Sequence, residues 1–513
     1  MVIKIEPREY QKSIFDTAKN YNTLVVLPTG VGKTLIALLL AVERIQKHPG
    51  SKVLFLAPTK PLVEQHYESF TRELPELFAD IQLFTGAVNA KERKRIWQTA
   101  EIIFSTPQCI ANDLEKGLYS LSEVSLLVID EAHRCLKNYD YTTVVNYYKQ
   151  SADKQRILGL TASPGSEIDN VRQICFNLAI EKIEIRTRDS PDVKQYLQDR
   201  EHEKIEVAFP KEFVEIHVLL KRLYNSLVDQ LKSRSLLFGP VNKITLLKLQ
   251  NQLARRAMQH DGNAMAGMSI TAQAIKISHA LELIETQTLS GLNEYMKGLM
   301  QQAQDKKSRG VQNLVRQQEF NAAWISLNEL LAKKVEHPKV EEVALIIENE
   351  LKQKPKAKAI VFTQFRETAS TLQKRLSLIE GAKPAIFIGQ AKKANSGLSQ
   401  KEQKGILDKF RVGELNVLCA TSIGEEGLDI PEVNAVIFYE PIPSAIRKIQ
   451  RAGRTARLAP GKIVMLITKD TRDEIYHYAS SSREKKMYTI IEKVQKELEN
   501  KNSPRGLDKY IKC

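Results

Sequence analysis

The segment 24–34, with the sequence LVVLPTGVGKT, constrains this chain more than any other. An apolar run ends at Pro28, two glycines follow, and a periodic apolar segment, 35–45, begins directly after Thr34. This order predicts a buried strand, a glycine-bearing loop and the first turn of a helix, where backbone N–H groups and the helix dipole bind an anion. Lys33 would reach the β- and γ-phosphates of a nucleotide, and the Thr34 hydroxyl would ligate Mg²⁺.

This loop departs from the strict phosphate-binding pattern at one position. The pattern has glycine six residues before Lys33, and this chain has Leu27 there. The remaining G-x-G-K-T, between a strand and a helix, still provides the backbone N–H groups, the lysine and the hydroxyl that bind phosphate and Mg²⁺. We therefore predict that the nucleotide lies against Pro28, Thr29, Gly30, Val31, Gly32, Lys33 and Thr34. The alternative is a glycine-rich turn with an ordinary surface lysine.

Composition limits the class of protein. A chain of 513 residues is too long for one core and predicts two to four domains. No apolar run approaches the ~18–20 residues of a membrane span, and the N-terminal residues lack a signal-peptide core, so we expect no membrane segment and a location inside the cell. Five scattered cysteines without a C-x-x-C pair disfavour a zinc site or disulfide framework. The net charge of +15 favours a polyanionic partner, nucleic acid above all.

Strands and helices alternate from residue 24 to about 203, which predicts a doubly wound parallel sheet. The expected strands are 24–27, 53–57, 81–84, 102–105, 126–130 and 157–160. Ligands of such sheets bind at the carboxyl ends of the strands, so the residues that follow each strand are the candidates for a site.

The strand 126–130 ends in the sequence DEAH, which carries two carboxylates. Asp130 could hold Mg²⁺, and Glu131 could polarise a water molecule for attack on the γ-phosphate. Hydroxyl groups follow other strands and suit phosphate contacts or signal relay, although singly they are common as helix caps and turns. They belong to Thr59, Thr106, Thr161 and Ser163. Gln11, before the first strand, could present a donor and an acceptor to an adenine edge, or simply lie at a solvated helix start.

Between about 204 and 335, leucines recur at helical spacing and no convincing strand is found, so long helices are expected. The window 221–260 carries a net charge of +7, which suits either a nucleic-acid interface or a solvated helix face. The segment 301–310 is polar and predicts a loop. The basic side chains that we predict to contact nucleic acid there are Lys232, Arg234, Lys243, Lys248, Arg255 and Arg256.

The α/β alternation resumes at 337, with expected strands at 359–362, 385–388, 417–420, 435–438 and 463–467. This second domain has no phosphate-binding loop but carries the sequence QRAGRTAR at 450–457. Its arginines suit an arrangement in which one domain presents guanidinium groups to the γ-phosphate held by another. Asp429, in a glycine-containing segment after a strand, could accept a hydrogen bond from a ribose hydroxyl.

These motifs resemble, in their order, those of a superfamily-two helicase. The stretches are LPTGVGKT, APTKPLVEQH, TPQ, DEAH, TASP, VFTQFR, ATSIGEEGLDIP and QRAGRTAR, and with Gln11 they span residues 8–457. The sequences of the TASPG and ATSIGEEGLDIP motifs, together with the helical insertion, are similar to those of the archaeal Hef and Fanconi anaemia M-type branch. The resemblance implies two RecA-like α/β domains with an all-α insertion: 1–203, 204–335 and 336–490, followed by a charged tail or linker at 491–513.

The resemblance also implies roles. ATP and Mg²⁺ would be the cofactors, and Arg8 with Gln11 would contact adenine. His133 would couple to Thr161, Ser163 and Gln450, while Arg454 and Arg457 would complete the γ-phosphate site. The residues implied to touch the nucleic-acid backbone are Thr59, Lys60, Thr106, Gln364, Arg366 and Thr421.

The implied function is an ATP-dependent translocase on forked or branched DNA, nucleoid-associated in a prokaryote or nuclear in a eukaryote, with a nuclease or sliding clamp as a fitting partner. Archaeal Hef proteins continue into an XPF-type nuclease, whose E-R-K-x-x-x-D motif is missing here, so no nuclease activity is expected. Two alternatives remain: an ATPase of the RNA-sensor and Dicer branch that depends on duplex RNA, and a non-catalytic nucleic-acid clamp.

Overall fold

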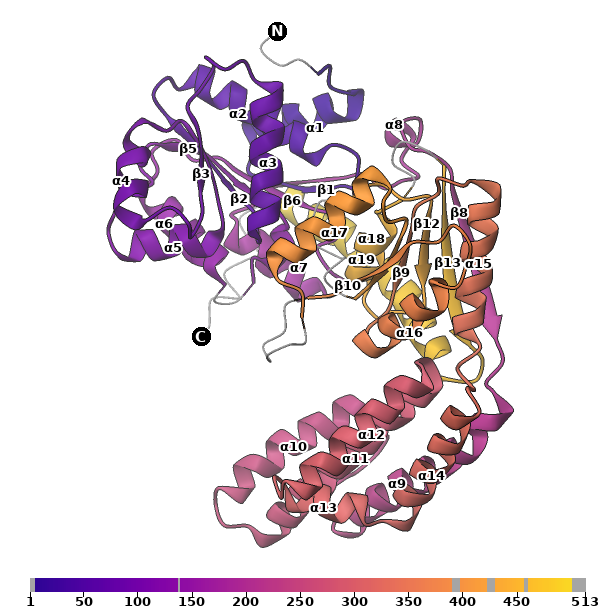
Figure 1. Ribbon diagram of the computed structural model, residues 1–513. Coiled ribbons are helices and arrows are strands. Elements are labelled where there is room, and N and C mark those ends of the chain that lie inside the picture. Colours follow the sequence, from indigo (N-terminus) through magenta and orange to yellow (C-terminus); the bar gives the residue numbers. More distant parts are fainter. Residues whose placement is uncertain (1–4, 137–138, 390–396, 422–429, 456–459, 501–513) are drawn as a thin grey trace.

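The computed structural model describes residues 5–136, 139–389, 397–421, 430–455 and 460–500. Its elements form two parallel-sheet domains and a bundle of helices that projects from the second one (Figure 1). The predicted fold class, two RecA-like domains with an all-α insertion, is confirmed.

The first domain is a seven-stranded parallel sheet in the order β3-β4-β2-β5-β6-β1-β7. Its strands are β1 (Thr23–Val26), β2 (Lys52–Leu56), β3 (Ile81–Phe84), β4 (Ile102–Ser105), β5 (Val124–Ile129), β6 (Ile157–Thr161) and β7 (Lys182–Ile185). One face packs on α1 (Glu9–Asn20), α2 (Lys33–Lys47) and α3 (Lys60–Glu73). The other packs on α4 (Ala90–Thr99), α5 (Pro107–Glu115), α6 (Asp140–Ser151) and α7 (Ile168–Asn177), and a 3₁₀ turn, η1 (Ala132–Arg134), follows β5.

The second domain is a six-stranded parallel sheet in the order β10-β11-β9-β12-β13-β8. Its strands are β8 (Arg200–Val207), β9 (Ala359–Phe362), β10 (Pro384–Phe387), β11 (Val417–Ala420), β12 (Ala435–Phe438) and β13 (Gly461–Thr468). One core lies under α15 (Lys339–Gln353) and α16 (Arg366–Leu376). The opposite face packs on α17 (Gln400–Val412) and α18 (Ala445–Ala452).

The insertion has its own apolar core, centred on the long helix α11. It comprises η2 (Lys211–Phe213), α9 (Val214–Ser233), α10 (Lys243–Ala257), α11 (Gly262–Thr286), α12 (Leu289–Gln304), α13 (Arg309–Val315) and α14 (Gln318–Ala332). The predicted loop 301–310 is therefore wrong at both ends, since α12 continues to Gln304 and α13 begins at Arg309. Leu299, Val311 and Leu314 account for this, because they anchor both helices in the bundle core.

Two predicted domain limits fall inside regular elements. The limit at 203/204 cuts β8, which pairs along its whole length with β13 of the second sheet. Both β8 and the missed strand β7 are edge strands, in which charged residues interrupt the apolar run that marks the central strands. The limit at 490/491 cuts α19 (Arg472–Glu499), and residues 501–513 lie outside the described part.

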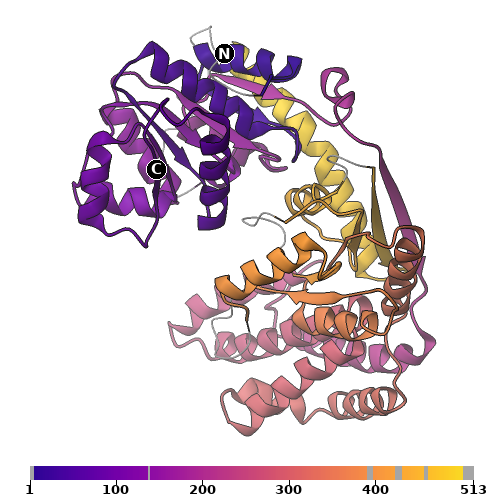
Figure 2. The same cartoon turned by 45° about the horizontal axis from the view of Figure 1, so that its top comes forward.

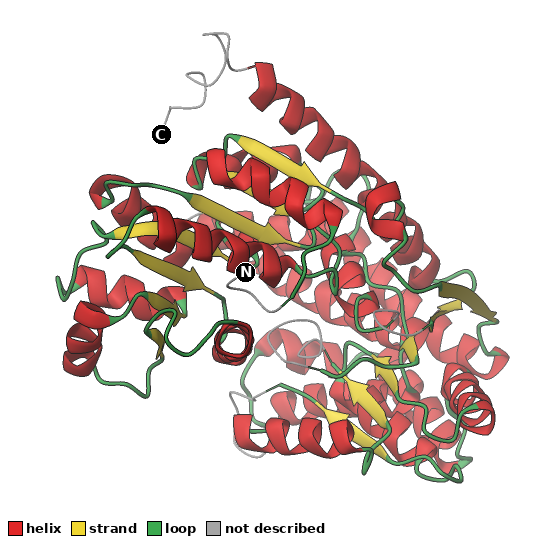
Figure 3. Ribbon diagram, turned by 90° about the horizontal axis from the view of Figure 1, so that it is seen from above, coloured by secondary structure: helices red, strands yellow, loops and turns green. Residues whose placement is uncertain are grey.

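The helix α19 links the two sheet domains. It leaves the second domain after β13 and runs to the first, as the yellow helix in Figure 2 shows. Met487, Ile490, Ile491 and Val494 lie in the core of the first domain. Arg172 of α7 pairs with Glu497 through two contacts of 3.0 and 2.7 Å. The helix lies beside β13 of the second sheet and β7 of the first, and Figure 3 gives the same arrangement of helices and strands seen from above. None of the described helices is long and apolar enough to cross a membrane.

A buried ionic cluster fastens the insertion to the second sheet. Lys339 Nζ donates to Asp473 Oδ2 at 2.7 Å and to the carbonyl of Thr286, at the end of α11, at 2.8 Å. Nearby, Glu440 Oε1 accepts from the backbone N–H of Gln364 at 2.6 Å. Burial raises the pKa of Glu440 to about 7; Asp473 adds to this rise, whereas Lys339, Arg451 and a hydrogen bond from Gln287 oppose it.

We expect Glu440→Gln to change how stability depends on pH. Because the folded-state pKa of about 7 lies above the usual 4.5, the native state binds more protons than the unfolded state between these values. This carboxyl therefore lowers the free energy of unfolding as pH rises through that window, by about 3 kcal/mol at about 1.4 kcal/mol per pKa unit. Glutamine keeps the acceptor but does not titrate.

Urea denaturation midpoints at pH 5, 6, 7 and 8 measure this effect. The variant should gain stability relative to the wild type as pH rises. Glu414→Gln, at an exposed site in the same domain, should run parallel to the wild type. If the urea midpoint of Glu440→Gln changed with pH in the same way as that of the wild type, the interpretation that this buried carboxyl titrates near pH 7 would be contradicted.

Candidate active site at the interdomain cleft

The glycine-bearing loop between β1 and α2 has the conformation that its sequence predicts. Gly30 and Gly32 have φ values of 83° and 78°, in the left-handed region that favours glycine. A Cβ at Gly32 would overlap the Gln11 amide, so a larger residue at this position would displace that side chain. Lys33 Nζ donates to the carbonyls of Leu27 and Pro28 at 3.0 and 3.1 Å and so lies within the turn.

The helix α1 is attached to this loop by side-chain hydrogen bonds. Gln11 Nε2 donates to the Val31 carbonyl at 3.2 Å, and its Oε1 accepts from the backbone N–H of Arg8 at 2.9 Å. The Tyr10 hydroxyl donates to the same Val31 carbonyl at 2.6 Å. The Arg8 guanidinium lies 4.7 Å from the centre of the Tyr196 ring. These contacts place the predicted adenine-reading residues beside the loop.

Asp130, directly after β5, is buried and contacts a residue that the sequence did not single out. Its Oδ2 lies 2.9 Å from His66 Nε2, and His66 Nδ1 lies 3.3 Å from Thr34 Oγ1. Burial alone would raise the pKa of Asp130, but the His66 contact and the charge of Lys33 outweigh it and hold the pKa below its usual value. The carboxyl is therefore ionised and faces the loop.

The next residues connect β5 to β6. Glu131 has a φ of 51°, and its carboxylate lies 3.2 Å from His133 Nδ1. The same His133 nitrogen lies 3.2 Å from Thr161 Oγ1, and Thr161 exchanges hydrogen bonds of 3.1 Å with the backbone of Ser163. The Ser163 hydroxyl donates to Met487 Sδ of α19 at 2.8 Å. Three of the predicted coupling residues, His133, Thr161 and Ser163, thus form one chain of contacts that reaches the helix shared with the second domain.

The second domain approaches the loop through the end of α18. Gln450 is buried on this helix, and Gly453 directly follows it. A Cβ at Gly453 would overlap Thr29 Oγ1, so the backbone of the second domain packs this closely on the Thr29 side chain only because this residue is glycine. The Arg454 carbonyl accepts from the Val433 N–H at 3.2 Å. Asp429 and Arg457 lie outside the described residues.

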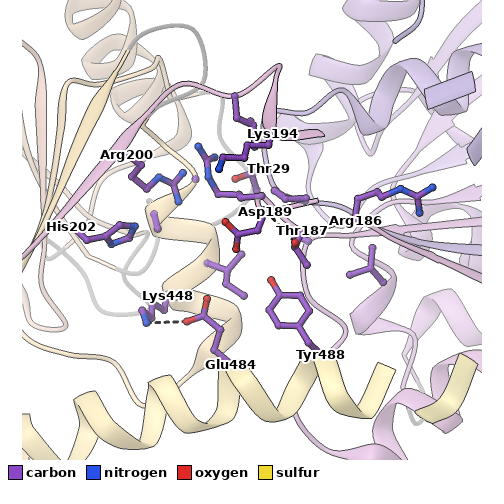
Figure 4. Close-up of a pocket in the computed structure, with 18 of the residues that line it drawn as sticks. Thr29, Arg186, Thr187, Asp189, Lys194, Arg200, His202, Lys448, Glu484 and Tyr488 are labelled. Carbon is purple, nitrogen blue, oxygen red and sulfur yellow. Dashed lines mark hydrogen bonds and ion pairs between the residues drawn. The ribbon is translucent and has the colours of Figure 1, made fainter. Parts of the chain in front are cut away.

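A cavity of about 660 Å³ lies beside this contact, between the two domains (Figure 4). Its walls come from the ends of β1 and β6, the segment 186–202, α18 and α19. Lys448 and Glu484 pair across it at 2.9 Å. Its basic lining suits an anionic ligand and consists of Arg186, Arg188, Lys194, Arg200 and Lys448, with Asp189, Asp199 and Glu484 as the acidic residues.

The predicted nucleic-acid contacts of the sheet domains lie at strand ends or helix starts. Thr59 and Thr106 precede α3 and α5, Lys60 pairs with Glu64 at 3.5 Å, and Thr421 follows β11 as a buried residue. Gln364 follows β9, and Arg366 begins α16, where its guanidinium donates to the Gly389 carbonyl at 2.9 Å. These residues lie at the carboxyl ends of the two sheets.

The basic residues of the insertion are not part of this cleft; they lie on α9, the loop after it and α10. Lys243 pairs with the buried Glu282 at 2.8 Å, and Arg256 pairs with Asp261 at 2.6 Å, so both also hold the bundle together. Arg234 reaches Asn263 at 3.3 Å. Lys232, Lys248 and Arg255 are exposed.

Comparisons with known proteins agree with this architecture. The family model "DEAD/DEAH box helicase" matches residues 8–171, and "Helicase conserved C-terminal domain" matches 341–459. A third, "Putative ATP-dependent RNA helicase, helical bundle", matches residues 212–336. The crystal structure of the Pyrococcus furiosus Hef helicase domain matches with a TM-score of 0.71 and 41% identity, over 94% of this chain and 100% of that one.

Two curated relatives are longer than this chain. The "Putative ATP-dependent RNA helicase" of Methanocaldococcus jannaschii is 38% identical over 95% of this chain and 61% of its own length. The "ATP-dependent DNA helicase mph1" of Neurospora crassa is 32% identical over 93% of this chain and 42% of its own length. The chain thus spans less than two thirds of either relative.

Two RecA-like domains with these motifs define an ATP-hydrolysing helicase of superfamily two. Within that superfamily, the chain belongs to the Hef and Fanconi anaemia M-type family, of which it is a helicase domain.

We expect Gly453→Ala to slow ATP hydrolysis without unfolding the protein. The methyl group would overlap Thr29 and hold the second domain away from the loop, whereas the backbone φ of −71° tolerates alanine. Misplacement of a catalytic group by about 1 Å can cost about 100-fold in rate, so the steady-state ATPase kcat should fall by that order.

Gly298→Ala is the matched control, because a Cβ at this glycine of α12 meets no atom within 4 Å. It should retain the wild-type rate. An unchanged kcat for Gly453→Ala would show that Thr29 and Gly453 do not approach each other during turnover.

Proposed function

We propose that this chain is an ATP-dependent DNA translocase that acts on forked or branched DNA and couples ATP hydrolysis to closure of its two sheet domains. The observation that carries the proposal is the contact of Gly453 with Thr29, which puts the QRAGR segment of one domain against the phosphate-binding loop of the other. A nucleotide bound there would touch both domains at once.

In this proposal, the phosphates of ATP lie against the N–H groups of Gly30 to Lys33 and against the Lys33 ammonium. Gln11 and Arg8 contact the adenine from α1. Glu131 accepts the proton of the attacking water, and its contact with His133 orients the carboxylate. Arg454 and Arg457 face the γ-phosphate from the second domain, and Asp429 contacts the ribose.

Mg²⁺ is the cofactor that such a site implies, and the residues present fit it. Thr34 Oγ1 and the Asp130 carboxylate lie on either side of one imidazole, so the loop side of this site carries two hard oxygen donors of the kind that Mg²⁺ prefers. Thr34 and Asp130 would hold the ion. When bound, Mg²⁺ would neutralise part of the phosphate charge during hydrolysis.

Binding and hydrolysis of ATP would drive closure and opening of the cleft. A ligand can shift the equilibrium between the open and closed states only if it binds them with different affinities. The γ-phosphate meets this condition if both domains contact it. Two paths could carry the change: the chain His133, Thr161, Ser163 and Met487, and the contact of Thr29 with Gly453. The strand-end residues of the two sheets would grip the nucleic-acid backbone at two separate points.

The insertion would select the shape of the substrate. Its helix α10 exposes both basic and apolar side chains: Lys243, Ile244, Leu247, Lys248 and Arg255. The buried cluster around Lys339 holds the bundle against the second sheet, so α10 would move with that domain. Binding through phosphates predicts little sequence preference and a strong dependence on salt.

Duplex RNA is the second candidate substrate. Both the family model that matches the insertion and the M. jannaschii relative are named as RNA helicases, whereas mph1 is named as a DNA helicase. The ATP-hydrolysing site between the two sheet domains would be the same for either substrate. A decayed, non-catalytic clamp is less well supported, since Lys33, Glu131, Arg454 and Arg457 are all present.

The first test compares ATPase rates with single-stranded DNA, duplex DNA, forked DNA, a four-way junction and duplex RNA. We expect forked or junction DNA to stimulate most, and Lys33→Ala to abolish stimulation. Greater stimulation by duplex RNA would move the chain to the RNA branch. Stimulated ATPase activity that survives Lys33→Ala would refute the catalytic mechanism.

The second test neutralises α10 with Lys248→Gln and Arg255→Gln. Each lost phosphate contact should lower the slope of log affinity against log salt by about one, so we expect a decrease of about two with forked DNA. Lys352→Gln with Lys356→Gln removes the same charge from an exposed part of the second domain and should leave the slope unchanged. Equal slopes for both pairs would exclude α10 from the interface.

A further inference from the structure

His66, on α3, lies between the two side chains that we propose as magnesium ligands. Its Nδ1 is 3.3 Å from Thr34 Oγ1, and its Nε2 is 2.9 Å from Asp130 Oδ2. Thr34 follows β1, Asp130 follows β5, and His66 belongs to the helix that follows β2. One imidazole of α3 therefore connects a side chain of α2 with the residue that follows β5.

The ring has little freedom to turn. The residue is only 8% exposed, and its ring packs on Phe55 of β2, with centroids 4.5 Å apart. Phe55 in turn packs on Phe70, one turn further along α3. This packing fixes the plane of the imidazole, and with it the direction of both ring nitrogens.

The hydrogen-bonding capacities of the three groups are complementary. An ionised carboxylate only accepts, so Nε2 carries the proton and donates it to Asp130. The other ring nitrogen, Nδ1, lies 3.3 Å from the Thr34 hydroxyl, which can donate to it. A hydroxyl that donates its proton in this way keeps its oxygen lone pairs for a cation.

We propose that His66 is a positioning residue of the metal site: it holds the Thr34 hydroxyl and the Asp130 carboxylate in the orientation that binds Mg²⁺ with a nucleotide. It does not itself ligate the ion. This inference rests on the nucleotide site proposed above and is independent of the nucleic-acid substrate. Outer partners that orient metal ligands commonly contribute about 10- to 100-fold to metal affinity.

A purely structural role for His66 makes a different prediction. Leucine fills a similar volume and would preserve the packing on Phe55, so a core residue could be exchanged with little effect on metal binding. A positioning residue could not, because leucine leaves both ligands without their common partner.

The test measures Mn²⁺ binding by electron paramagnetic resonance, with ADP present so that no turnover is needed, and ADP affinity separately in EDTA. We expect His66→Leu to weaken Mn²⁺ binding by about 10- to 100-fold and to leave the affinity for ADP in EDTA unchanged. His66→Gln, whose amide can restore one of the two contacts, should lose less. Phe70→Leu removes packing from the same Phe55 ring without touching either ligand, and should keep the wild-type Mn²⁺ affinity.

Wild-type affinity for Mn²⁺ in His66→Leu would overturn the inference, and so would an equal loss in Phe70→Leu. Should His66→Leu fail to fold, as judged by circular dichroism, the comparison of His66→Gln with Phe70→Leu decides in the same way. If the wild-type protein binds no Mn²⁺ with ADP, the proposed magnesium–nucleotide site itself is refuted.

Discussion

The parallel pairing of β2, β5, β6 and β1 is the constraint on which the rest of this molecule depends. These strands are neighbours in the first sheet, and in-register pairing brings their carboxyl ends to one edge. Strand spacing of about 4.8 Å then places segments that are far apart in the sequence within reach of one another. The chain of contacts from Thr34 through His66 to Asp130, and from His133 to Thr161, follows directly from this alignment.

The second requirement is that the two sheet domains contact each other while each keeps its own sheet and core. Thr29 and Gly453 allow the domains to touch at the phosphate-binding loop, and α19 adds a tie, since its first half follows β13 and its second half lies in the core of the first domain. The buried Lys339 ammonium pairs with Asp473 and also donates to the Thr286 carbonyl, and so holds the insertion to the second sheet. Among the described residues, the two domains therefore meet at the phosphate-binding loop and along α19, and the second domain carries the helical bundle.

Most of the fold could be predicted because the strands of a doubly covered parallel sheet are apolar throughout and stand out from their surroundings. The strand 81–84 and the central strands 102–105, 359–362, 417–420 and 435–438 have the predicted limits. The edge strands β7 and β8 were not predicted from the sequence, because an edge strand has one partner strand and can carry charged residues. The same reason explains why the first domain limit was placed inside β8.

The sequence by itself determined what depends on neighbours along the chain: the strand–glycine loop–helix around Lys33, the acidic pair at the end of β5, and the order of the motifs. Local backbone geometry and residue chemistry are enough for these features. Only the tertiary structure decided which distant residues share a site. His66 became a partner of Thr34 and Asp130, Gly453 met Thr29, and Met487 reached Ser163 because sheet order and helix packing, which no local pattern encodes, brought them together.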